Sequence, residues 1–370
     1  MTVDAQERLD TMALLAAADP ADMLRQVASS AAQVRTAVRA TQEADLDEII
    51  AAGRPRAIVV TGMGGSGIAG SVLAAICGPG CPAQVLPVHD YQLPAWVGAT
   101  DLVIAVSCSG ATEETIAAAT AAVRRGCRLI GVGGEDSELA MIAQQARAPF
   151  IGVPSAGMPR STLWGLSMPL VVISSRLGLL EAGEAEYESA AAELERISYL
   201  CRPDSESFIN PAKSLALELS GTLPVIWGTS SLAAVAAYRF ACQLNENAKY
   251  PAVTGALPEA NHNQVVTFDG PFAAGLDVIG EDGPAVPLRL VLLRDSQEHP
   301  QVARRREESA RLAEQRGIGI TELAAADGSP LDRLASLVQL IDYATVYLAV
   351  ALGIDPGPVA AIQELKARIA

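Results

Sequence analysis

The sequence predicts an α/β protein of two domains, each a parallel sheet with helices on both faces in three layers. Short apolar runs alternate with alanine-rich helical segments along most of the chain, which is typical of βαβ units. Half of the 370 residues are hydrophobic and only 4% are aromatic, as suits helices packed closely on a buried parallel sheet. A strand, a glycine- or serine-containing turn and a helix follow one another once in each half, so we expect a duplicated fold.

Residues 1–50 are expected to form amphipathic helices that cover the first domain, because Met23, Val27, Val34 and Val38 recur at helical spacing. Beyond them the apolar residues form short continuous runs, which predict buried strands. The predicted strands of this half are 57–61, 84–88, 102–106, 129–132 and 150–153.

The middle of the chain is expected to separate two domains. An apolar helix is predicted to end near Leu180, and the acidic residues 181–196 are expected to form a solvent-facing helix. Residues 202–211 are polar and contain proline, which is typical of a linker. We place a helical cover with the first domain at 1–200, the linker at 201–212, and the second domain with its C-terminal helices at 213–370.

The second half repeats the pattern of the first. An alanine-rich run from Leu232 to Leu244 predicts a buried helix, with Ser230 or Ser231 as its N-cap, and Pro251 ends any continuation of that helix. The other predicted strands are 224–227, 265–268, 288–293 and 318–323, and the other predicted helices are 302–316, 331–352 and 359–369.

Composition excludes several classes of function. A net charge of −15 argues against a nucleic-acid or anionic-membrane surface. The six cysteines show no CxxC pair and no zinc-like spacing with histidine, so we expect no metal site and interpret them as small buried residues in a reducing cytoplasm. The N-terminus lacks the apolar core of a signal peptide, and no run of about 18 apolar residues is free of polar interruption. We therefore expect a soluble cytoplasmic protein.

The stretch 245–263, NENAKYPAVTGALPEANHN, gathers the groups that an acid/base site needs. Glu246 falls in the last turn of the predicted helix, where the negative end of the helix dipole is expected to raise the pKa of its carboxyl, as suits a general base. His262, one of three histidines in the chain, follows on an irregular segment. The alternative interpretation is a polar helix end followed by a surface loop.

A glycine-rich loop follows the first predicted strand. Gly62, Gly64 and Gly67 fit GxGxxG between a strand and a helix, and Asp90 ends the second strand at about the right distance for a ribose contact. On this loop alone, a dinucleotide site and a phosphate site are both open.

The loop after the third strand favours a phosphate monoester. Ser107, Ser109 and Thr112 place three hydroxyls at the start of a helix, and Ser66 adds a fourth from the first loop. Amides at a helix N-terminus attract anions, and hydroxyls donate to phosphate oxygens without adding fixed charge. A dinucleotide fold has no need of this second loop. Ordinary capping of two helices would explain Ser66 and one other hydroxyl, but not all four.

The motifs TGMGGSGIAG, SCSGATEET, MPRSTLWGL, NENAKYP, PEANHN and DPGPVAAIQELK together resemble the sugar isomerase (SIS) fold and, within it, the bifunctional phosphoglucose/phosphomannose isomerase family. The resemblance runs from about residue 55 to the C-terminus. It implies two SIS domains, a homodimer, and no metal or organic cofactor. The implied reaction interconverts glucose 6-phosphate or mannose 6-phosphate with fructose 6-phosphate through a cis-enediolate.

The resemblance also implies roles for individual residues. Glu246 would move a proton between C1 and C2, and His262, contributed across the dimer interface, would help to open the sugar ring. Arg160 would stabilise the enediolate, and Lys366 would assist ring opening. On the residues alone, Lys366 is also expected in the last turn of a terminal helix, and Arg160 could anchor a loop through an ion pair. The implied phosphate-binding residues are Gly64, Gly65, Ser66, Ser107, Ser109 and Thr112.

Four positions depart from the family pattern. Cys108 and Ala111 stand where the family has an aromatic residue and an asparagine, Gln264 replaces a glutamate, and Gly357 replaces a threonine. Residues 281–300 are also longer than the family norm. These changes keep a second hypothesis open, a sugar-phosphate-binding SIS protein with little or no activity and a regulatory role. A third, an NAD-dependent oxidoreductase, has only the GxGxxG loop in its favour.

Overall fold

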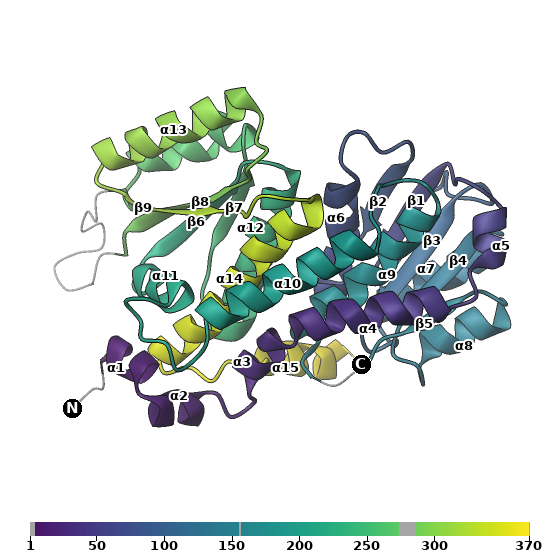
Figure 1. The fold of residues 1–370 in the computed structure, drawn as a ribbon, viewed down its shortest axis with the longest axis horizontal. Coiled ribbons are helices and arrows are strands. Elements are labelled where there is room, and N and C mark those ends of the chain that lie inside the picture. Colours follow the sequence, from purple (N-terminus) through teal and green to yellow (C-terminus); the bar gives the residue numbers. More distant parts are fainter. Residues whose placement is uncertain (1–3, 155–156, 274–285, 370) are drawn as a thin grey trace. The chain divides into compact units, whose positions relative to one another are not determined.

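The computed structural model describes residues 4–154, 157–273 and 286–369, and it confirms the predicted fold class, with two parallel sheets flanked by helices (Figure 1). The chain divides into two compact units. We call Ser29–Glu195 with Ser329–Leu331 the first unit, and Met1–Ala28, Arg196–Gly328 and Asp332–Ala370 the second unit. The division therefore differs from the expected one, because the first helices group with the second half of the chain.

The first unit contains a five-stranded parallel sheet in the order β2-β1-β3-β4-β5. The two central strands, β1 and β3, are buried along their whole length, as their continuous apolar runs predicted. In the register of this sheet Ile58 lies opposite both Val85 and Leu102. The strands are β1 (Ala57–Thr61), β2 (Gln84–Val88), β3 (Leu102–Ser107), β4 (Arg128–Gly133) and β5 (Phe150–Gly152), so all five predicted strands are confirmed to within one or two residues.

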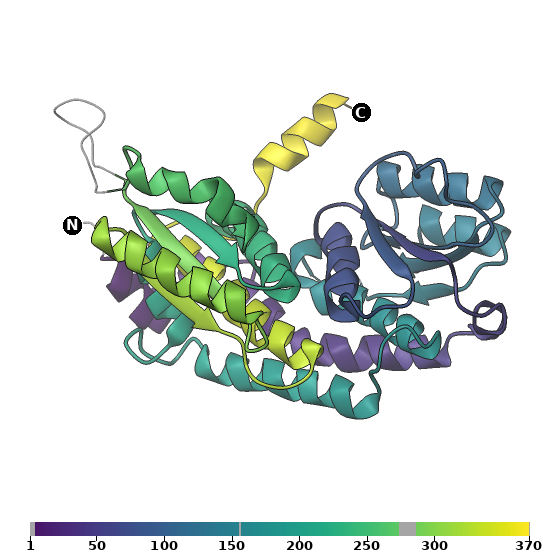
Figure 2. The ribbon, with the colours of Figure 1, turned by 90° about the horizontal axis from the view of Figure 1, so that it is seen from above.

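Helices cover both faces of this sheet (Figure 2). α7 and α8 pack on the face that carries Val59 and Val103. α6 packs on the opposite face, where Gly70 allows the helix to approach Val60 closely. The helices of the first unit are α4 (Ser30–Glu43), α5 (Asp47–Ala51), α6 (Gly64–Cys77), α7 (Glu113–Arg124), α8 (Glu138–Gln145), the short 3-10 helix η1 (Pro159–Ser161), α9 (Leu163–Arg176) and most of α10 (Glu184–Leu200).

The second unit contains a four-stranded parallel sheet in the order β7-β6-β8-β9. Its apolar core includes Trp227, which stacks on Phe268 at 5.5 Å between ring centroids. The strands are β6 (Leu223–Gly228), β7 (Val253–Ala256), β8 (Leu288–Arg294) and β9 (Gly319–Ala324).

The predicted strand at 265–268 is wrong, because this segment lies in the 3-10 helix η3 (Gln264–Asp269) and β7 takes the place in the sheet. Phe268 is buried, but Val266 is 65% exposed. The segment contains β-branched residues that favour a strand, but it does not bury a continuous face, as a strand inside a sheet would. Within the segment 281–300, which was expected to be longer than the family norm, residues 288–294 form β8, and residues 281–285 lie outside the described part of the chain.

The expected linker is ordered in the second unit. The carboxamide of Asn210 caps α11 by accepting from the amides of Ala212 and Lys213. The Lys213 ammonium group donates to the carbonyl oxygens of Leu9 and Pro203, so it ties α1 to this segment. The helices of the second unit are α1 (Ala5–Asp10), α2 (Met12–Ala18), α3 (Met23–Ala28), α11 (Pro211–Leu219), α12 (Ser231–Ala248), the 3-10 helices η2 (Glu259–His262) and η3, α13 (Pro300–Gln315), nearly all of α14 (Pro330–Ala351), and α15 (Ala360–Ile369).

Among the described residues, α14 is the one helix long and apolar enough to cross a membrane. However, 94% of its most apolar window is buried inside the protein. A helix that is apolar on all sides is expected in the core of a large protein, and α14 lies there.

Candidate active site

The loop between β1 and α6 brings the start of a long helix to the carboxyl edge of the first sheet. Gly64 has a φ of +55°, in the left-handed region that favours glycine. At Gly65 a Cβ would lie 3.4 Å from the Pro159 carbonyl oxygen, so this loop packs closely against η1. The N-cap of α6 is Met63, whose side chain makes no capping hydrogen bond. The first amides of α6 are therefore not satisfied by a side chain at the N-cap.

The loop after β3 brings the predicted hydroxyls together in the same unit. The Ser107 Oγ lies 3.0 Å from the Thr112 Oγ1 and 3.5 Å from the Ser109 Oγ. The Ser66 Oγ accepts a hydrogen bond of 3.1 Å from the Cys108 amide, which joins the two loops. We call Ser66, Ser107, Ser109 and Thr112 the hydroxyl cradle.

The structure does not support helix capping as the role of these hydroxyls. Thr112 is the N-cap of α7, yet its side chain makes no capping hydrogen bond. Ser66 is the third residue of α6 rather than its N-cap. The cradle thus combines hydroxyl groups with two helix N-termini, a combination that suits a phosphate group.

Arg160 lies beside the cradle. It is only 4% exposed, and its Cα would be 3.8 Å from a Cβ at Gly65, so the backbone of η1 packs on the first turn of α6. Arg160 is therefore a buried cationic residue whose backbone the fold of the first unit brings to this loop.

The sequence reasoning missed His89, which also contacts the glycine-rich loop. The Nδ1 of His89 lies 2.9 Å from the Gly62 carbonyl oxygen, and its ring leaves no room for a Cβ at Gly67. The signal was available, since His89 directly follows β2 and the carboxyl ends of neighbouring parallel strands meet at one edge of a sheet.

The three other predicted catalytic residues belong to the second unit, beginning with Glu246 in the last turn of α12. Glu246 is half-buried. The helix ends at Lys249, which adopts the left-handed conformation with a φ of 54°. The Lys249 ammonium group donates to the carbonyl oxygens of Glu246 and Asn247 at 2.9 and 3.2 Å, so a positive charge partly offsets the helix dipole there. The expected rise in the Glu246 pKa stays a prediction.

His262 ends η2 and is exposed. Two residues later, Gln264 is anchored on both sides of its carboxamide. Its Oε1 accepts from the Trp227 Nε1 at 2.6 Å, and its Nε2 donates to the Thr254 carbonyl oxygen at 2.8 Å. Gln264 therefore fixes the segment that contains His262 to β6 and β7 of the second sheet.

Lys366 lies on α15, a helix with no buried residue that stands clear of the second sheet in Figure 2. The turn before this helix contains Gly357, whose amide donates to the Asp355 Oδ1 at 2.8 Å. Within the described parts of the chain, no group of three histidine, cysteine, aspartate or glutamate side chains is placed to hold a metal ion.

Comparisons with known proteins agree with these features. A family model described as the bacterial phospho-glucose isomerase C-terminal SIS domain matches residues 208–369. A bifunctional phosphoglucose/phosphomannose isomerase from Caldicellulosiruptor bescii is 33% identical over 315 residues, which cover 85% of this chain and 89% of that protein. The chain belongs to the bifunctional phosphoglucose/phosphomannose isomerase family.

Two further similarities are consistent with this family. A bifunctional phosphoglucose/phosphomannose isomerase from Aquifex aeolicus is 31% identical over 312 residues, covering 84% of this chain and 89% of that protein. A solved structure of a hypothetical protein from Thermus thermophilus matches with a TM-score of 0.72 at 16% identity, over 99% of this chain and 93% of that one. The second similarity concerns the fold alone.

Gln264 departs from the glutamate that is expected at this position in the isomerase family, and the structure gives a physical reason for it. A glutamate at position 264 could accept from Trp227, but it could not donate to the Thr254 carbonyl oxygen as the Gln264 amide does. At the cradle, Cys108 is buried, and its sulfur lies 3.5 Å from the Thr162 Oγ1. Cys108 thus points into the first unit, while its amide serves Ser66.

Proposed function

We propose that this isomerase interconverts glucose 6-phosphate and mannose 6-phosphate with fructose 6-phosphate. The hydroxyl cradle is the observation that carries the proposal, because its hydroxyls are gathered at two helix N-termini without serving as caps. A phosphate monoester offers several acceptor oxygens to such a group of donors. The phosphate does not react, so the cradle acts as a grip that places the sugar.

In the proposed reaction, Glu246 acts on the sugar whose phosphate the cradle holds. Its carboxylate removes the proton from C2 of the open-chain aldose, which gives a planar cis-enediolate. The same carboxylic acid then returns the proton to C1, while the hydroxyl proton moves from O2 to O1. One base serves both carbons because both transfers occur on one face of the intermediate, and such catalysis contributes on the order of 100 to 10,000-fold.

The negative charge of the enediolate requires stabilisation, and we assign this role to Arg160. Arg160 is buried and its backbone packs on the first turn of α6, so its guanidinium would supply fixed positive charge without reorganisation during the reaction. We assign ring opening to His262, which would move a proton between the ring oxygen and the C1 hydroxyl, with help from Lys366. Both are on segments where the side chain is open to solvent in the single chain.

We further propose that the protein works as a cytoplasmic homodimer in which His262 of one protomer serves the sugar bound by its partner. The exposed position of His262 and the three exposed apolar residues of α15 support an interface between copies. Ile362, Leu365 and Ile369 are 43%, 60% and 75% exposed and recur at helical spacing. Light scattering with the wild type and a Leu365→Glu variant would test this, since a charge on that stripe should weaken a dimer.

The deciding experiment supplies fructose 6-phosphate to the purified protein and measures glucose 6-phosphate and mannose 6-phosphate by separate coupled assays. We expect both aldoses to form. Unphosphorylated fructose is the control substrate, and we expect no measurable turnover because it offers nothing to the cradle. If neither aldose forms although fructose 6-phosphate binds, the protein is instead a sugar-phosphate-binding SIS protein without isomerase activity.

A further inference from the structure

The far end of α6 carries two thiols that the isomerase reaction does not use. Cys77 is the last residue of the helix, and Gly78 ends it with a φ of +61°. Gly78, Pro79, Gly80 and Cys81 then form a turn closed by a hydrogen bond of 3.3 Å from the Cys81 amide to the Gly78 carbonyl oxygen. The turn folds the chain back on the helix end, and both cysteines line one cavity there.

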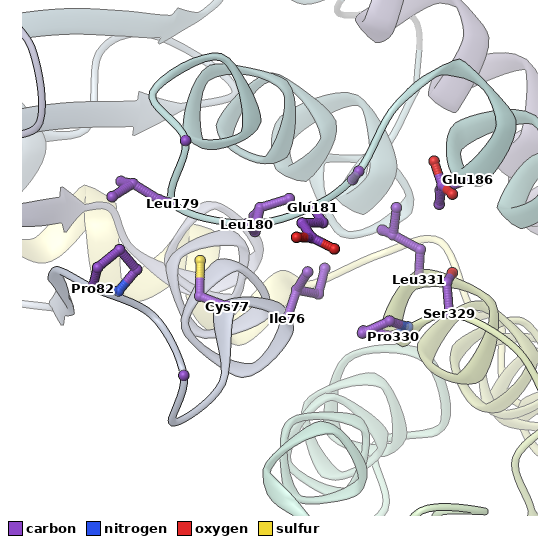
Figure 3. Close-up of a pocket in the computed structure, with 13 residues that line it drawn as sticks. Ile76, Cys77, Pro82, Leu179, Leu180, Glu181, Glu186, Ser329, Pro330 and Leu331 are labelled. Atoms are coloured by element: carbon purple, nitrogen blue, oxygen red, sulfur yellow. The ribbon is translucent and has the colours of Figure 1, made fainter.

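Both sulfur atoms are within reach of solvent. Cys77 and Cys81 are half-buried free thiols, and both line a cavity of about 410 Å³. Cys77 also lines a second cavity of about 570 Å³ in the first unit. Figure 3 shows its sulfur directed into this cavity toward Leu179 and Leu180. A small oxidant can therefore reach the pair without unfolding the helix.

The two thiols differ in chemical character. Burial, the neighbouring Cys81 charge and the hydrogen bond to Cys81 together raise the pKa of the Cys77 thiol to about 12. Cys77 thus remains protonated near neutral pH. The thiolate is the reactive form of cysteine, so the raised pKa makes Cys77 slow to attack an oxidant. Cys81 is therefore the sulfur that we expect to react first.

We propose that Cys77 and Cys81 are a reversible dithiol–disulfide pair that hydrogen peroxide oxidises. The Cys81 thiolate attacks one peroxide oxygen, which forms a sulfenic acid and releases the other oxygen as water. The Cys77 sulfur then attacks the Cys81 sulfur, forming the disulfide and releasing a second water with the Cys77 proton. Two thiols lose two electrons, and one peroxide is reduced to two waters. In reducing compartments such disulfides are transient, so the thiol form is the resting state.

The other cysteines provide the comparison. Cys108 and Cys201 are buried. Cys127 is half-buried like Cys77 and Cys81. Its pKa is raised by burial and by the nearby Asp101 charge, and no second thiol contributes. Cys127→Ser is therefore the matched control for a substitution of Cys81.

The experiment treats the native full-length protein with hydrogen peroxide, denatures it, alkylates the remaining thiols and counts them by mass spectrometry. We expect two of the six cysteines to become unavailable, to be mapped to Cys77 and Cys81, and to return after dithiothreitol. The Cys127→Ser variant should show the same reversible loss, and Cys81→Ser should show none. Six alkylated cysteines after oxidation of the wild type, or a reversible loss that persists in Cys81→Ser, would overturn the proposal.

A second probe needs no oxidation. Phenylarsine oxide condenses with two neighbouring thiols, and its oxygen leaves as water with both thiol protons. We expect one equivalent to protect Cys77 and Cys81 from alkylation in the native wild type, and Cys81→Ser to lose this protection while circular dichroism shows it folded. Unprotected Cys77 and Cys81 in the wild type would show that the sulfurs are not close enough to act as a pair.

Discussion

In both sheets a central strand runs through a short loop into a long helix, and the next strand ends beside the start of that helix. In the first unit β1 leads to α6, and β3 ends at Ser107. In the second unit β6 leads through residues 229–230 to α12, and β8 ends at Arg294, just before Asp295. The corresponding position thus carries neutral hydroxyls in the first unit and a carboxylate in the second.

The Asp295 carboxylate fills the anion position of the second unit. Its Oδ2 accepts from the Ser230 Oγ at 2.5 Å, and its Oδ1 accepts from Arg333 at 3.0 Å and from the Gln297 amide at 3.1 Å. Ser230 in turn caps α12 by accepting from the Ala233 amide. Asp295 is 3% exposed, so its carboxylate is paired inside the protein rather than with a ligand.

The two loops differ in whether the chain itself supplies an anion to them. A duplicated loop can bind an anion only where the chain does not supply one itself. We propose that the first unit uses its hydroxyls to bind a phosphate, whereas in the second unit Ser230 and Arg333 hold Asp295. Under our proposal, the second unit contributes chemistry through Glu246 and His262 instead of a second phosphate site.

The largest effect is expected for the base that we assign to the second unit. Glu246→Gln should lower kcat by on the order of 100 to 10,000-fold, because the amide cannot accept the C2 proton. Binding of fructose 6-phosphate, measured by calorimetry, should change by no more than a few-fold. Glu314→Gln, at an exposed position of α13, is the control and should leave kcat unchanged. A fully active Glu246→Gln enzyme would remove Glu246 from the mechanism.

The next largest effect is expected on the free energy of unfolding when Asp295 is substituted. Asp295→Asn leaves the buried Arg333 charge unpaired, and breaking a buried pair in this way costs on the order of 3 to 5 kcal/mol in the free energy of unfolding. Denaturant unfolding measures this loss. The KM for fructose 6-phosphate should stay unchanged in the fraction that folds.

The control for Asp295→Asn removes the second charge as well. Asp295→Asn combined with Arg333→Met should be more stable than Asp295→Asn alone, because no unpaired buried charge remains. If Asp295→Asn instead raises KM without loss of stability, the second loop takes part in substrate binding, and the comparison between the two units fails.

The opposite pattern is expected at the hydroxyl cradle. Ser107→Ala should raise KM by roughly 10 to 100-fold, since one hydrogen bond to a charged group contributes on the order of 1.5 to 3 kcal/mol. Because the phosphate does not react, kcat should change less than KM. The matched control is Ser230→Ala at the equivalent loop of the second unit, which should lower stability and leave KM unchanged. A collapsed kcat at constant KM would place the phosphate elsewhere.

The sequence alone predicted the features that depend on local pattern. Buried parallel strands are continuous apolar runs, so β1 was found with both of its ends and β3 to within one residue. The cradle hydroxyls were found because they directly follow such strands. The strand β7 was missed because its four residues include Gly255 and depend on pairing with β6 rather than on an apolar pattern.

Features that depend on contacts between distant segments could not be predicted. Nothing local shows that Asp295 meets Arg333 across 38 positions of the chain, or that Gln264 holds Trp227. The pairing of Cys77 with Cys81 was missed for another reason. Their spacing does not fit CxxC, and it is the turn through Gly78 that brings the thiols together.

The smallest expected signal comes from co-expressing two inactive variants. It tests whether Glu246 and His262 of one active site come from one chain or from two. If His262 acts on the sugar held by the partner protomer, inactive Glu246→Gln and inactive His262→Ala chains should restore activity when they are co-expressed. Random assembly gives half heterodimers, each with one complete site of two, so activity should approach roughly a quarter of the wild-type rate. Co-expression matters because a stable dimer would not exchange subunits after purification. A purified heterodimer that is no more active than its parents would mean that Glu246 and His262 serve a site from one chain, or that His262 only supports the structure.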